Sequence, residues 1–390
     1  MYRRRVLLVL VSFLALSLPA FLHPGSALAG KEGESFIEAV LSVSYPEGRD
    51  LRGRRAEAAF VGKEIARMAA RLAPEIGDGS DPARTVSALN RLLFSKEGFT
   101  YDPAPGNPDN YLPDRVLSRK RGNCLGLTVV YLALAERLDI PLRGVYVPSH
   151  CFARYEGNGA RINIEPAENG TERSDDRYRR DFGLGENRPY LMSLAAPEMV
   201  GVYMKSLGAA YSRMGLETEA LRIYREASLR YPGLPDAWFN AGVSYQKTGR
   251  LDDAIDQYRR ALSLDPELAA ARDNLGAALA AKGLYREALE EARRAAALAP
   301  SNVATRGNLA ATLCACGETE EGIREYRRIL AVDPRNARAL AGLATAHYER
   351  GEYEEAILHC DRAIEAGCRL DPGMVSALDK RRSPFAAPVR

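Results

Sequence analysis

Histidine, tryptophan and cysteine are scarce in this chain, and their scarcity limits the chemistry that the chain can carry. The 390 residues include four histidines, one tryptophan and six cysteines. No CxxC pair occurs, and the adjacent His150 and Cys151 would be awkward ligands for a single ion, so the sequence predicts no metal site. The cysteines are also too sparse for the disulfide framework of a small secreted domain. We therefore expect neither a metal nor a cofactor.

The chain also lacks a strong excess of charge of either sign. Its formal net charge is +3, and three arginines lie within residues 1–29, which contain no acidic side chain. Without that segment the basic and acidic side chains are equal in number, at 51 each. A neutral chain has no basic surface of the kind that binds nucleic acid, so we expect no nucleic-acid partner.

The first 29 residues have the layout of a secretory signal peptide. Arg3, Arg4 and Arg5 precede an apolar run, and Ala27 to Ala29 supply the small residues of a cleavage site. Pro19 interrupts the run, which favours cleavage over a spanning helix. We expect an exported protein, periplasmic or secreted, without a membrane span once the signal is removed. Retention of the segment as an N-terminal anchor is the alternative.

A repeat of 34 residues begins near residue 201 and continues without a gap. Glycine recurs at one phase of each of five units, at Gly215, Gly249, Gly283, Gly317 and Gly351. A small residue follows five positions later, and a proline closes four of the units. Glycine suits the end of a first helix because it reaches the left-handed conformation at little cost, whereas proline ends the second helix.

This pattern resembles the tetratricopeptide repeat (TPR), whose helix pairs stack into an all-α superhelix with a concave face. The expected units are 201–234, 235–268, 269–302, 303–336 and 337–370, followed by a flexible tail at 371–390. The resemblance implies a protein or peptide partner in the concave groove. The groove residues expected to contact it are Phe239, Asn240, Asn274, Asn308 and Tyr348. The three asparagines also fit a simple repeat consensus with no binding role.

The segment before the repeats is expected to mix helices with a small sheet. Apolar spacing predicts helices over 56–72, ending before Pro74, and over 82–94, whereas 100–115 is dense in Pro, Gly, Asn and Asp and is expected to be a loop. Asn123 is a suitable N-cap for a buried helix that runs to Leu138. Three strands are expected at 143–147, 150–155 and 160–164, with the last two joined by a turn at 157–159.

Three side chains with complementary chemistry fall in this segment. Cys124 stands at the expected helix start, where free N–H groups and the helix dipole stabilise a thiolate. His150, the one histidine of the segment, begins a strand, and Glu165 ends the next strand. A thiolate needs a base, and the base needs an orienting acceptor. The trio therefore predicts a nucleophilic site at one end of the hairpin.

The order and layout of these residues resemble the transglutaminase-like superfamily, and more closely its bacterial branch that is fused to TPRs. The resemblance implies an α+β transglutaminase/papain-like domain over 30–198, with its motif core at about 90–170. It also implies that Cys124 is the nucleophile, His150 the general base and then acid, and Glu165 the orienting acceptor. The chain departs from the family in having Glu165 where aspartate is more usual, and in having no tryptophan beside the thiol or the acid.

Two functions follow from these resemblances. The first is an exported cysteine hydrolase or acyltransferase that attacks an amide or peptide bond, with the repeats binding a protein partner or substrate. The second is a non-catalytic interaction scaffold of the cell envelope. Cys151 alternates with His150 along its strand and is expected in the core, although a bond between Cys124 and Cys151 would silence the site.

Overall fold

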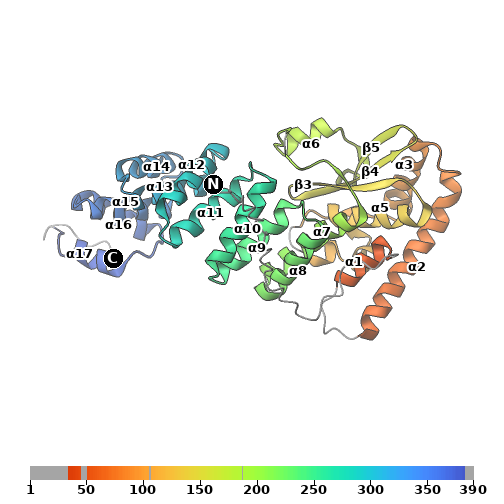
Figure 1. Cartoon of the computed structure of the whole chain (residues 1–390), viewed down its shortest axis with the longest axis horizontal. Coiled ribbons are helices and arrows are strands. Elements are labelled where there is room, and N and C mark those ends of the chain that lie inside the picture. Colours follow the sequence, from red (N-terminus) through yellow and green to blue (C-terminus); the bar gives the residue numbers. More distant parts are fainter. Residues whose placement is uncertain (1–33, 45–50, 105–106, 187, 383–390) are drawn as a thin grey trace, which may run out of the picture.

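The computed structural model describes residues 34–44, 51–104, 107–186 and 188–382. The expected signal peptide at 1–29 lies outside these residues, as do 383–390. The described chain consists of an N-terminal α/β part and an array of consecutive helices that extends away from it to one side (Figure 1). The α+β domain followed by an all-α superhelix is thus confirmed.

The first helices of the described chain agree with expectation except at the end of α2. Helix α1 spans Phe36–Ser44, α2 spans Leu51–Ile76 and α3 spans Pro82–Asn90, continued by a π-helical turn η1 over Arg91–Lys96. Pro74 lies inside α2 rather than beyond its end. A proline in a last turn costs little beyond the one hydrogen bond it cannot donate, and Ile76, just after it, is buried in the core.

The segment expected as a loop at 100–115 contains structure. Strand β1 (Thr100–Tyr101) pairs in parallel with β2 (Arg121–Gly122), the short helix η2 spans Pro108–Asn110, and α4 spans Pro113–Arg119. Pro113 occupies the first turn of α4, where a missing N–H costs nothing. Two of the prolines that suggested a loop, Pro108 and Pro113, instead mark helix starts.

The sheet is antiparallel with the strand order β6-β5-β4-β3-β7. Its long strands are β3 (Leu142–Val147), β4 (His150–Gly157) and β5 (Ala160–Glu165), and its short strands are β6 (Thr171–Glu172) and β7 (Ser193–Leu194). The buried helix α5 (Cys124–Leu138) packs against β3 and β4, while α6 (Asp175–Asp181) lies beyond the end of β5 (Figure 1).

The array consists of five helix pairs in which each helix contacts the next. Its helices are α7 (Ala196–Arg213), α8 (Glu217–Arg230), α9 (Pro235–Lys247), α10 (Leu251–Leu264), α11 (Ala269–Ala281), α12 (Tyr285–Leu298), α13 (Val303–Ala315), α14 (Thr319–Val332), α15 (Ala337–Glu349) and α16 (Tyr353–Glu365). The five phased glycines follow the first helix of each pair, and all have φ between +75° and +84°. A side chain there would be strained, so the turn requires glycine.

Helix α7 belongs to the core of the N-terminal part as well as to the array. Its Met199, Tyr203 and Leu207 are buried in one hydrophobic cluster with residues of α1, α5 and the sheet. The same cluster continues into Ile223 of α8 and Ala237 of α9. The first repeat is therefore fixed to the N-terminal part by shared packing.

A buried ion pair fastens the array a second time. Arg188, in the loop that leads to β7, donates from Nε to Oδ2 of Asp265 at 3.1 Å. Asp265 follows α10, and its side chain is 1% exposed. The Tyr190 hydroxyl also donates to this carboxylate at 3.2 Å. The Tyr190 ring packs edge-on against the ring of Tyr146 in β3, with 6.0 Å between the ring centroids. Together these contacts connect the sheet to the second helix pair.

The expected flexible tail forms a further helix over much of its length. Helix α17 (Pro372–Asp379) is capped by Asp371, which accepts from the Met374 N–H at 2.7 Å. Met374 and Leu378, four residues apart, are buried against α15 and α16. Their spacing supplies one apolar face, which covers the last repeat as a terminal cap.

The ion pair at the junction generates a first prediction. Replacing Arg188→Met leaves the buried Asp265 carboxylate without its cation, so we expect the free energy of unfolding to fall by about 3 kcal/mol. The matched control is Arg293→Met, which breaks exposed pairs with Glu318 and Glu321 and should cost at most about 1 kcal/mol. Chemical denaturation followed by circular dichroism measures both. Equal losses in the two variants would contradict the structural role of the junction.

Candidate functional site

The start of helix α5 is held in place by the loop before α4. Asn123 accepts from the Gly126 N–H through Oδ1 at 2.9 Å, and its own N–H donates to the Asn110 carbonyl at 2.9 Å. Gly126 is needed for this approach, because a Cβ there would lie 2.2 Å from the same carbonyl. Cys124 is therefore fixed at the N-terminal end of a helix, where the dipole favours an anion.

The register of the hairpin brings His150 and Glu165 to the same end of the sheet. Ala153 pairs with Ile164, which places Phe152 opposite Glu165. His150 is two residues before Phe152, so it lies on the same face and diagonal to Glu165. His150 begins β4 and Glu165 ends β5.

The carboxylate of Glu165 is buried and fully hydrogen-bonded. Its side chain is 1% exposed. Oε2 lies 2.8 Å from Nε2 of His150 and accepts from the Tyr178 hydroxyl at 2.7 Å, while Oε1 accepts from the Ala167 N–H at 2.9 Å. With Nε2 engaged by Glu165, Nδ1 is the nitrogen left for Cys124. This is the arrangement in which an acid orients a base.

The three groups form a coupled charge system. A hydrogen bond with Cys151 lowers the pKa of Cys124 most strongly, burial opposes that effect, and a hydrogen bond with His150 lowers the pKa further. Burial alone would lower the pKa of His150, but hydrogen bonds to Cys124 and Glu165 outweigh it and raise the pKa to about 9. Both shifts in pKa favour the thiolate–imidazolium form of the pair.

Burial would likewise raise the pKa of Glu165, but the hydrogen bond and charge of His150 keep that pKa below its ordinary value. The acid thus remains a carboxylate although it is removed from water. A permanent negative charge beside the imidazole is what sustains the imidazolium.

Cys151 is in the core, and its thiol also contacts Cys124. It is 2% exposed, on the face of β4 that packs against α5. Burial and the hydrogen bond to Cys124 raise the pKa of the Cys151 thiol well above its ordinary value. Cys151 is therefore a neutral donor beside the thiolate. All six cysteines lie within the described residues, and all six are free thiols.

A second group of buried side chains holds α6 against the hairpin. The guanidinium of Arg154 is fully buried and donates to Asn163 at 2.6 Å, to Asp175 at 2.6 Å and to the Leu191 carbonyl at 2.9 Å. Asp175 begins α6, the helix that carries Tyr178. This network therefore fixes the tyrosine that binds Glu165.

Aromatic rings fill the space around the imidazole. Phe182 stacks on His150 with ring centroids 5.4 Å apart, and Tyr178 stacks at 6.2 Å. Tyr178 in turn stacks on Phe152 at 4.0 Å. These rings pack around the imidazole and restrict its rotation.

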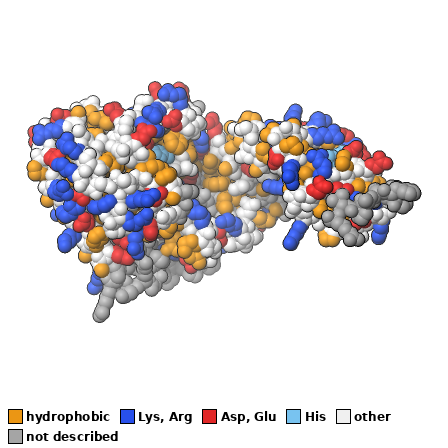
Figure 2. Space-filling model, turned by 180° about the vertical axis from the view of Figure 1, so that it is seen from behind, with side chains coloured by type: hydrophobic (Ala, Val, Ile, Leu, Met, Phe, Trp, Pro, Cys, Tyr) orange, Lys and Arg blue, Asp and Glu red, His pale blue; other side chains and the backbone are white. Residues whose placement is uncertain are grey.

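Cys124 and His150 line a cavity of about 350 Å³ that the array helps to enclose. Its lining residues come from α5, the β3–β4 turn, α7 and α9. They are Tyr111, Asn123, Cys124, Leu125, Tyr146, Ser149, His150, Cys151, Val202, Lys205, Ser206, Ala209, Arg213, Asp236, Phe239 and Asn240. Seen from behind, the molecule is hollowed where the two parts meet, with basic and acidic side chains interspersed on this face (Figure 2).

The groove residues expected from the repeats fall into two groups. Phe239 and Asn240 line this cavity together with Cys124. The other three are engaged within the array, because Asn274 bonds with Tyr258, Asn308 donates to Asp273 at 3.0 Å, and Tyr348 packs against Tyr353. The structure thus brings two of the five groove residues to the thiol.

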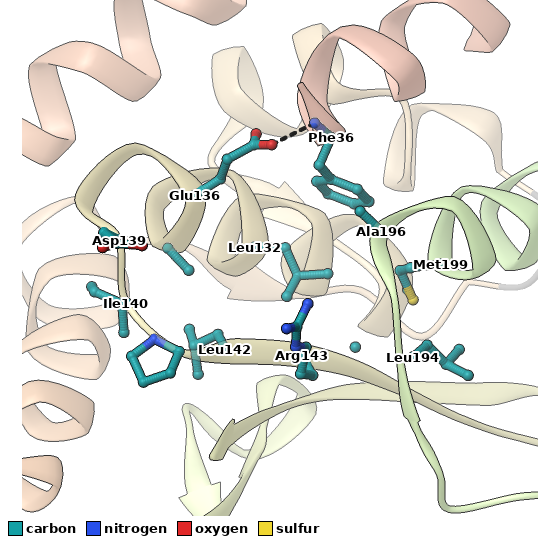
Figure 3. Close-up of a pocket in the computed structure, with 13 residues that line it drawn as sticks. Phe36, Leu132, Glu136, Asp139, Ile140, Leu142, Arg143, Leu194, Ala196 and Met199 are labelled. Atoms are coloured by element: carbon teal, nitrogen blue, oxygen red, sulfur yellow. Dashed lines mark hydrogen bonds between the residues drawn. The ribbon is translucent and has the colours of Figure 1, made fainter. Parts of the chain in front are cut away.

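A further cavity, of about 380 Å³, lies among α1, α5, β3 and α7 (Figure 3). There the Phe36 N–H donates to Oε1 of Glu136 at 2.6 Å, and Arg143 and Met199 contribute to the lining. Its described lining contains no cysteine or histidine. It therefore offers no nucleophile and base, and the cavity at Cys124 is the candidate site.

Sequence reasoning missed Tyr178 and Tyr111, and it did not predict that Lys205 would line the cavity at Cys124. Tyr178 lies on α6, a helix that was not expected, and contacts Glu165 from there. Lys205 belongs to the first repeat, which was expected to form a separate domain. The spacing of Tyr178 and Phe182, four residues apart, is a weak signal of a helix face with two aromatic rings. Tyr111 has no comparable signal.

Comparison with protein families agrees with both resemblances. Residues 59–182 match the model of the transglutaminase-like superfamily, and residues 235–268 and 315–374 match models of the tetratricopeptide repeat. The chain therefore joins a transglutaminase-like domain to TPRs, and this combination supports a role in protein interaction.

Curated relatives match only part of the chain. A UPF0162 protein of Xylella fastidiosa is 32% identical over 118 residues, which cover 28% of this chain and 40% of the relative. A UPF0162 protein of Pseudomonas aeruginosa is 32% identical over 93 residues, or 24% of this chain and 34% of the relative. The chain thus spans 40% or less of the length of these relatives.

Solved TPR structures resemble the array. MamA is 24% identical, with 41% of this chain and 94% of that chain covered and a TM-score of 0.38. YrrB, described as a TPR protein with an unusual peptide-binding site, is 20% identical; the match covers 46% of this chain and 92% of YrrB, with a TM-score of 0.41. PilF of Pseudomonas aeruginosa is 20% identical; the match covers 48% of this chain and 88% of PilF, with a TM-score of 0.42.

No group of three or more histidine, cysteine, aspartate or glutamate side chains in the described ranges is placed to hold a metal ion. Within the same ranges, no helix combines the length and the apolar character that crossing a bilayer requires.

The contact between the two thiols generates a prediction about Cys124. Replacing Cys151→Ala removes a donor to the thiolate, so the pKa of Cys124 should rise. Its alkylation by iodoacetamide at pH 6 should slow once that pKa exceeds 6, by about tenfold for each further unit. The control is Cys151→Ser, which retains a hydroxyl donor and should preserve most of the rate. Alkylation rates measured by peptide mapping compare the three proteins. Equal rates in the Ala and wild-type proteins would show that Cys151 does not act on the thiolate.

Proposed function

We propose that the chain is a cysteine-dependent amide hydrolase or acyltransferase whose TPR array binds a protein partner or substrate. The observation that carries this proposal is the placement of Cys124 at the N-terminal end of α5, in a cavity shared with His150, which is itself bonded to Glu165; this surrounding lowers the pKa of Cys124. A thiol kept only for packing gains nothing from this arrangement, and perturbed groups that share a cavity are a mark of catalytic sites.

The first half of the reaction uses the ion pair as found. The Cys124 thiolate attacks the carbonyl carbon of an amide and forms a tetrahedral intermediate, whose negative oxygen lies near the helix start. The N–H groups of Gly126 and Leu127 are already bound to Asn123. The N–H groups of Cys124 and Leu125 therefore remain as donors for this oxygen.

Collapse of the intermediate completes the acylation. The C–N bond breaks as the His150 imidazolium gives its proton to the leaving amine, and a thioester remains on Cys124. Water or a second amine then attacks the thioester, and neutral His150 takes the proton of the attacking group. The products are a carboxylic acid or a new amide, and the thiolate and imidazolium are restored.

The alternative function is a scaffold that retains the superfamily fold without chemistry. The same array would then recruit an envelope protein, and Cys124 would be an inert thiol. Both functions use the array as a binding surface, so the behaviour of Cys124 separates them.

Alkylation of Cys124 tests the proposal directly. We expect iodoacetamide to label Cys124 at pH 6 at least about tenfold faster than Cys316, a partly exposed thiol of the array whose pKa is raised by burial. Labelling of Cys124 should fall only as the pH drops through its lowered pKa. An equally slow reaction of both thiols would favour the scaffold.

Turnover should also have an alkaline limit. His150 acts as an acid in acylation, so activity should decline as the pH rises through about 9, where the imidazolium loses its proton. Any amide substrate found by screening a peptide library must lose turnover in Cys124→Ala, while Cys316→Ala serves as the matched control. A substrate that Cys124→Ala still turns over would refute the mechanism.

We further propose that the protein is exported, because the expected signal peptide fits the layout of residues 1–29. Expression of the full chain in a bacterial host followed by intact-mass measurement tests this proposal. The expected result is a mature species that lacks residues 1–29 and is recovered from the periplasm or the medium. An uncleaved chain that stays with the cytoplasmic fraction would contradict export.

A further inference from the structure

One wall of the cavity at Cys124 is built by the first helices of the first two repeats. The lining residues of α7 are Val202, Lys205, Ser206, Ala209 and Arg213. Their spacing of mostly three and four residues places them on a single helix face. Helix α9 adds Asp236, Phe239 and Asn240. The face expected to line the concave groove of the array is therefore also a face of the candidate active site.

This wall carries two cations that no described acidic side chain pairs with. Lys205 is half-buried, and its Nζ lies 4.8 Å from the ring centroid of Tyr146. Its charge reaches the neighbouring thiol, where it acts to lower the pKa of Cys151. Arg213 is exposed and lies eight residues further along α7, about 12 Å at the helical rise of 1.5 Å per residue.

The other charged groups of the cavity partly offset these two cations. The buried Glu165 carboxylate lies behind His150, so its charge adds to that of the Cys124–His150 pair. Asp236 is the one carboxylate of the described lining, and the Tyr190 hydroxyl donates to it at 3.4 Å. The attraction for an anionic group is therefore local to the face of α7 that carries Lys205 and Arg213.

A buried hydroxyl in the same cavity also lacks a partner. Tyr111 is 3% exposed and lines the cavity, yet its hydroxyl has no hydrogen-bond partner among the described residues. A buried, unpaired hydroxyl is costly. Such a group is retained at a site when a ligand supplies the missing partner.

We propose that this wall binds a carboxylate of the acyl substrate, with Lys205 as its ion partner and the Tyr111 hydroxyl as a further donor to the bound chain. The inference rests on the proposed function only for the chemistry at Cys124. The substrate is then a peptide or protein segment with an acidic group close to the scissile amide. That group is either an aspartate or glutamate side chain or a free C-terminus.

An extended peptide fits the dimensions of the wall. Such a chain advances at most about 3.5 Å per residue, so the 12 Å from Lys205 to Arg213 corresponds to about four residues. Arg213 therefore lies beside a residue further along the same bound peptide, where its charge attracts an acidic peptide without an ion pair at the scissile amide. Phe239 and Asn240, on α9, offer apolar and polar contacts between these ends.

Two small reagents measure the effect of Lys205 at the thiol. Iodoacetate and iodoacetamide alkylate Cys124 by the same reaction and differ in charge. We expect the rate with iodoacetate, divided by the rate with iodoacetamide, to fall by about fivefold in Lys205→Met and to be preserved in Lys205→Arg. The matched control is Arg222→Met, which removes an exposed cation of α8 outside the cavity and should leave the ratio unchanged. An unchanged ratio in Lys205→Met would overturn the role of Lys205.

Peptide binding tests the substrate class without relying on catalysis. The affinities of four fluorescein-labelled peptides are measured with the full-length Cys124→Ala protein. The peptides share one sequence and differ only in having Glu or Gln at one position and a free or an amidated C-terminus. Tighter binding of the Glu peptide identifies a side-chain carboxylate, and tighter binding of the free acid identifies a C-terminus. Either preference should be lost in Lys205→Met and weaken with added salt. Equal binding of all four peptides would overturn the proposal even if Cys124 proves reactive.

Tyr111→Phe separates ligand binding from folding. Since the hydroxyl has no partner among the residues that the structure describes, its removal should leave thermal stability unchanged or raise it, whereas binding of the preferred peptide should weaken by about fivefold. A loss of stability with unchanged binding would assign the hydroxyl to the fold and remove it from the site.

Discussion

The buried carboxylate of Glu165 sets the constraint on which the site depends. A charge removed from water must be neutralised and hydrogen-bonded, or the fold would not retain it. Here the partners come from three different places: the imidazole of His150, the hydroxyl of Tyr178 and the Ala167 N–H. The end of β4, the helix α6 and the turn after β5 must therefore all be in register. The lowered pKa of Cys124 depends on this arrangement in part, because it is set by the hydrogen bond with Cys151 and then by His150, whose own pKa is raised by Cys124 and Glu165.

The second constraint is the sharing of α7 between two structural units. If a flexible linker joined the TPR array to the N-terminal part, the groove would have no fixed orientation relative to the thiol of Cys124. Burial of Tyr203 in the core of the N-terminal part, together with the Arg188–Asp265 pair, makes the first two repeats a rigid wall of the cavity. The repeats are thus part of the site as well as a binding surface beyond it. A change in what the first repeat presents, such as the charge of Lys205, is therefore a change in the reacting cavity.

The parts of the site that sequence predicts are those with strong local signals. The cap at Asn123 fixes the start of α5, and the turn at 157–159 fixes the hairpin that carries His150 and Glu165. Alternation along β4 correctly places Cys151 in the core, but it says nothing about which helix packs on that face, so the contact with Cys124 was not predictable. Tyr178 and Lys205 are brought in by tertiary packing, which local patterns do not encode. The helix α17 at the start of the expected tail was not predicted, because the nearby prolines outweighed the apolar pair Met374 and Leu378, whose burial requires a neighbouring repeat.

The account as a whole depends on the charge state of Cys124 in the resting protein. The ultraviolet absorbance of a thiolate, measured as the difference between the wild-type and Cys124→Ala proteins across a pH titration, reports that state directly. The predicted result is a thiolate signal already present below neutral pH and lost when His150→Asn removes the imidazolium. A signal that appears only above the ordinary pKa of a cysteine thiol, or that is unaffected by His150→Asn, would contradict it.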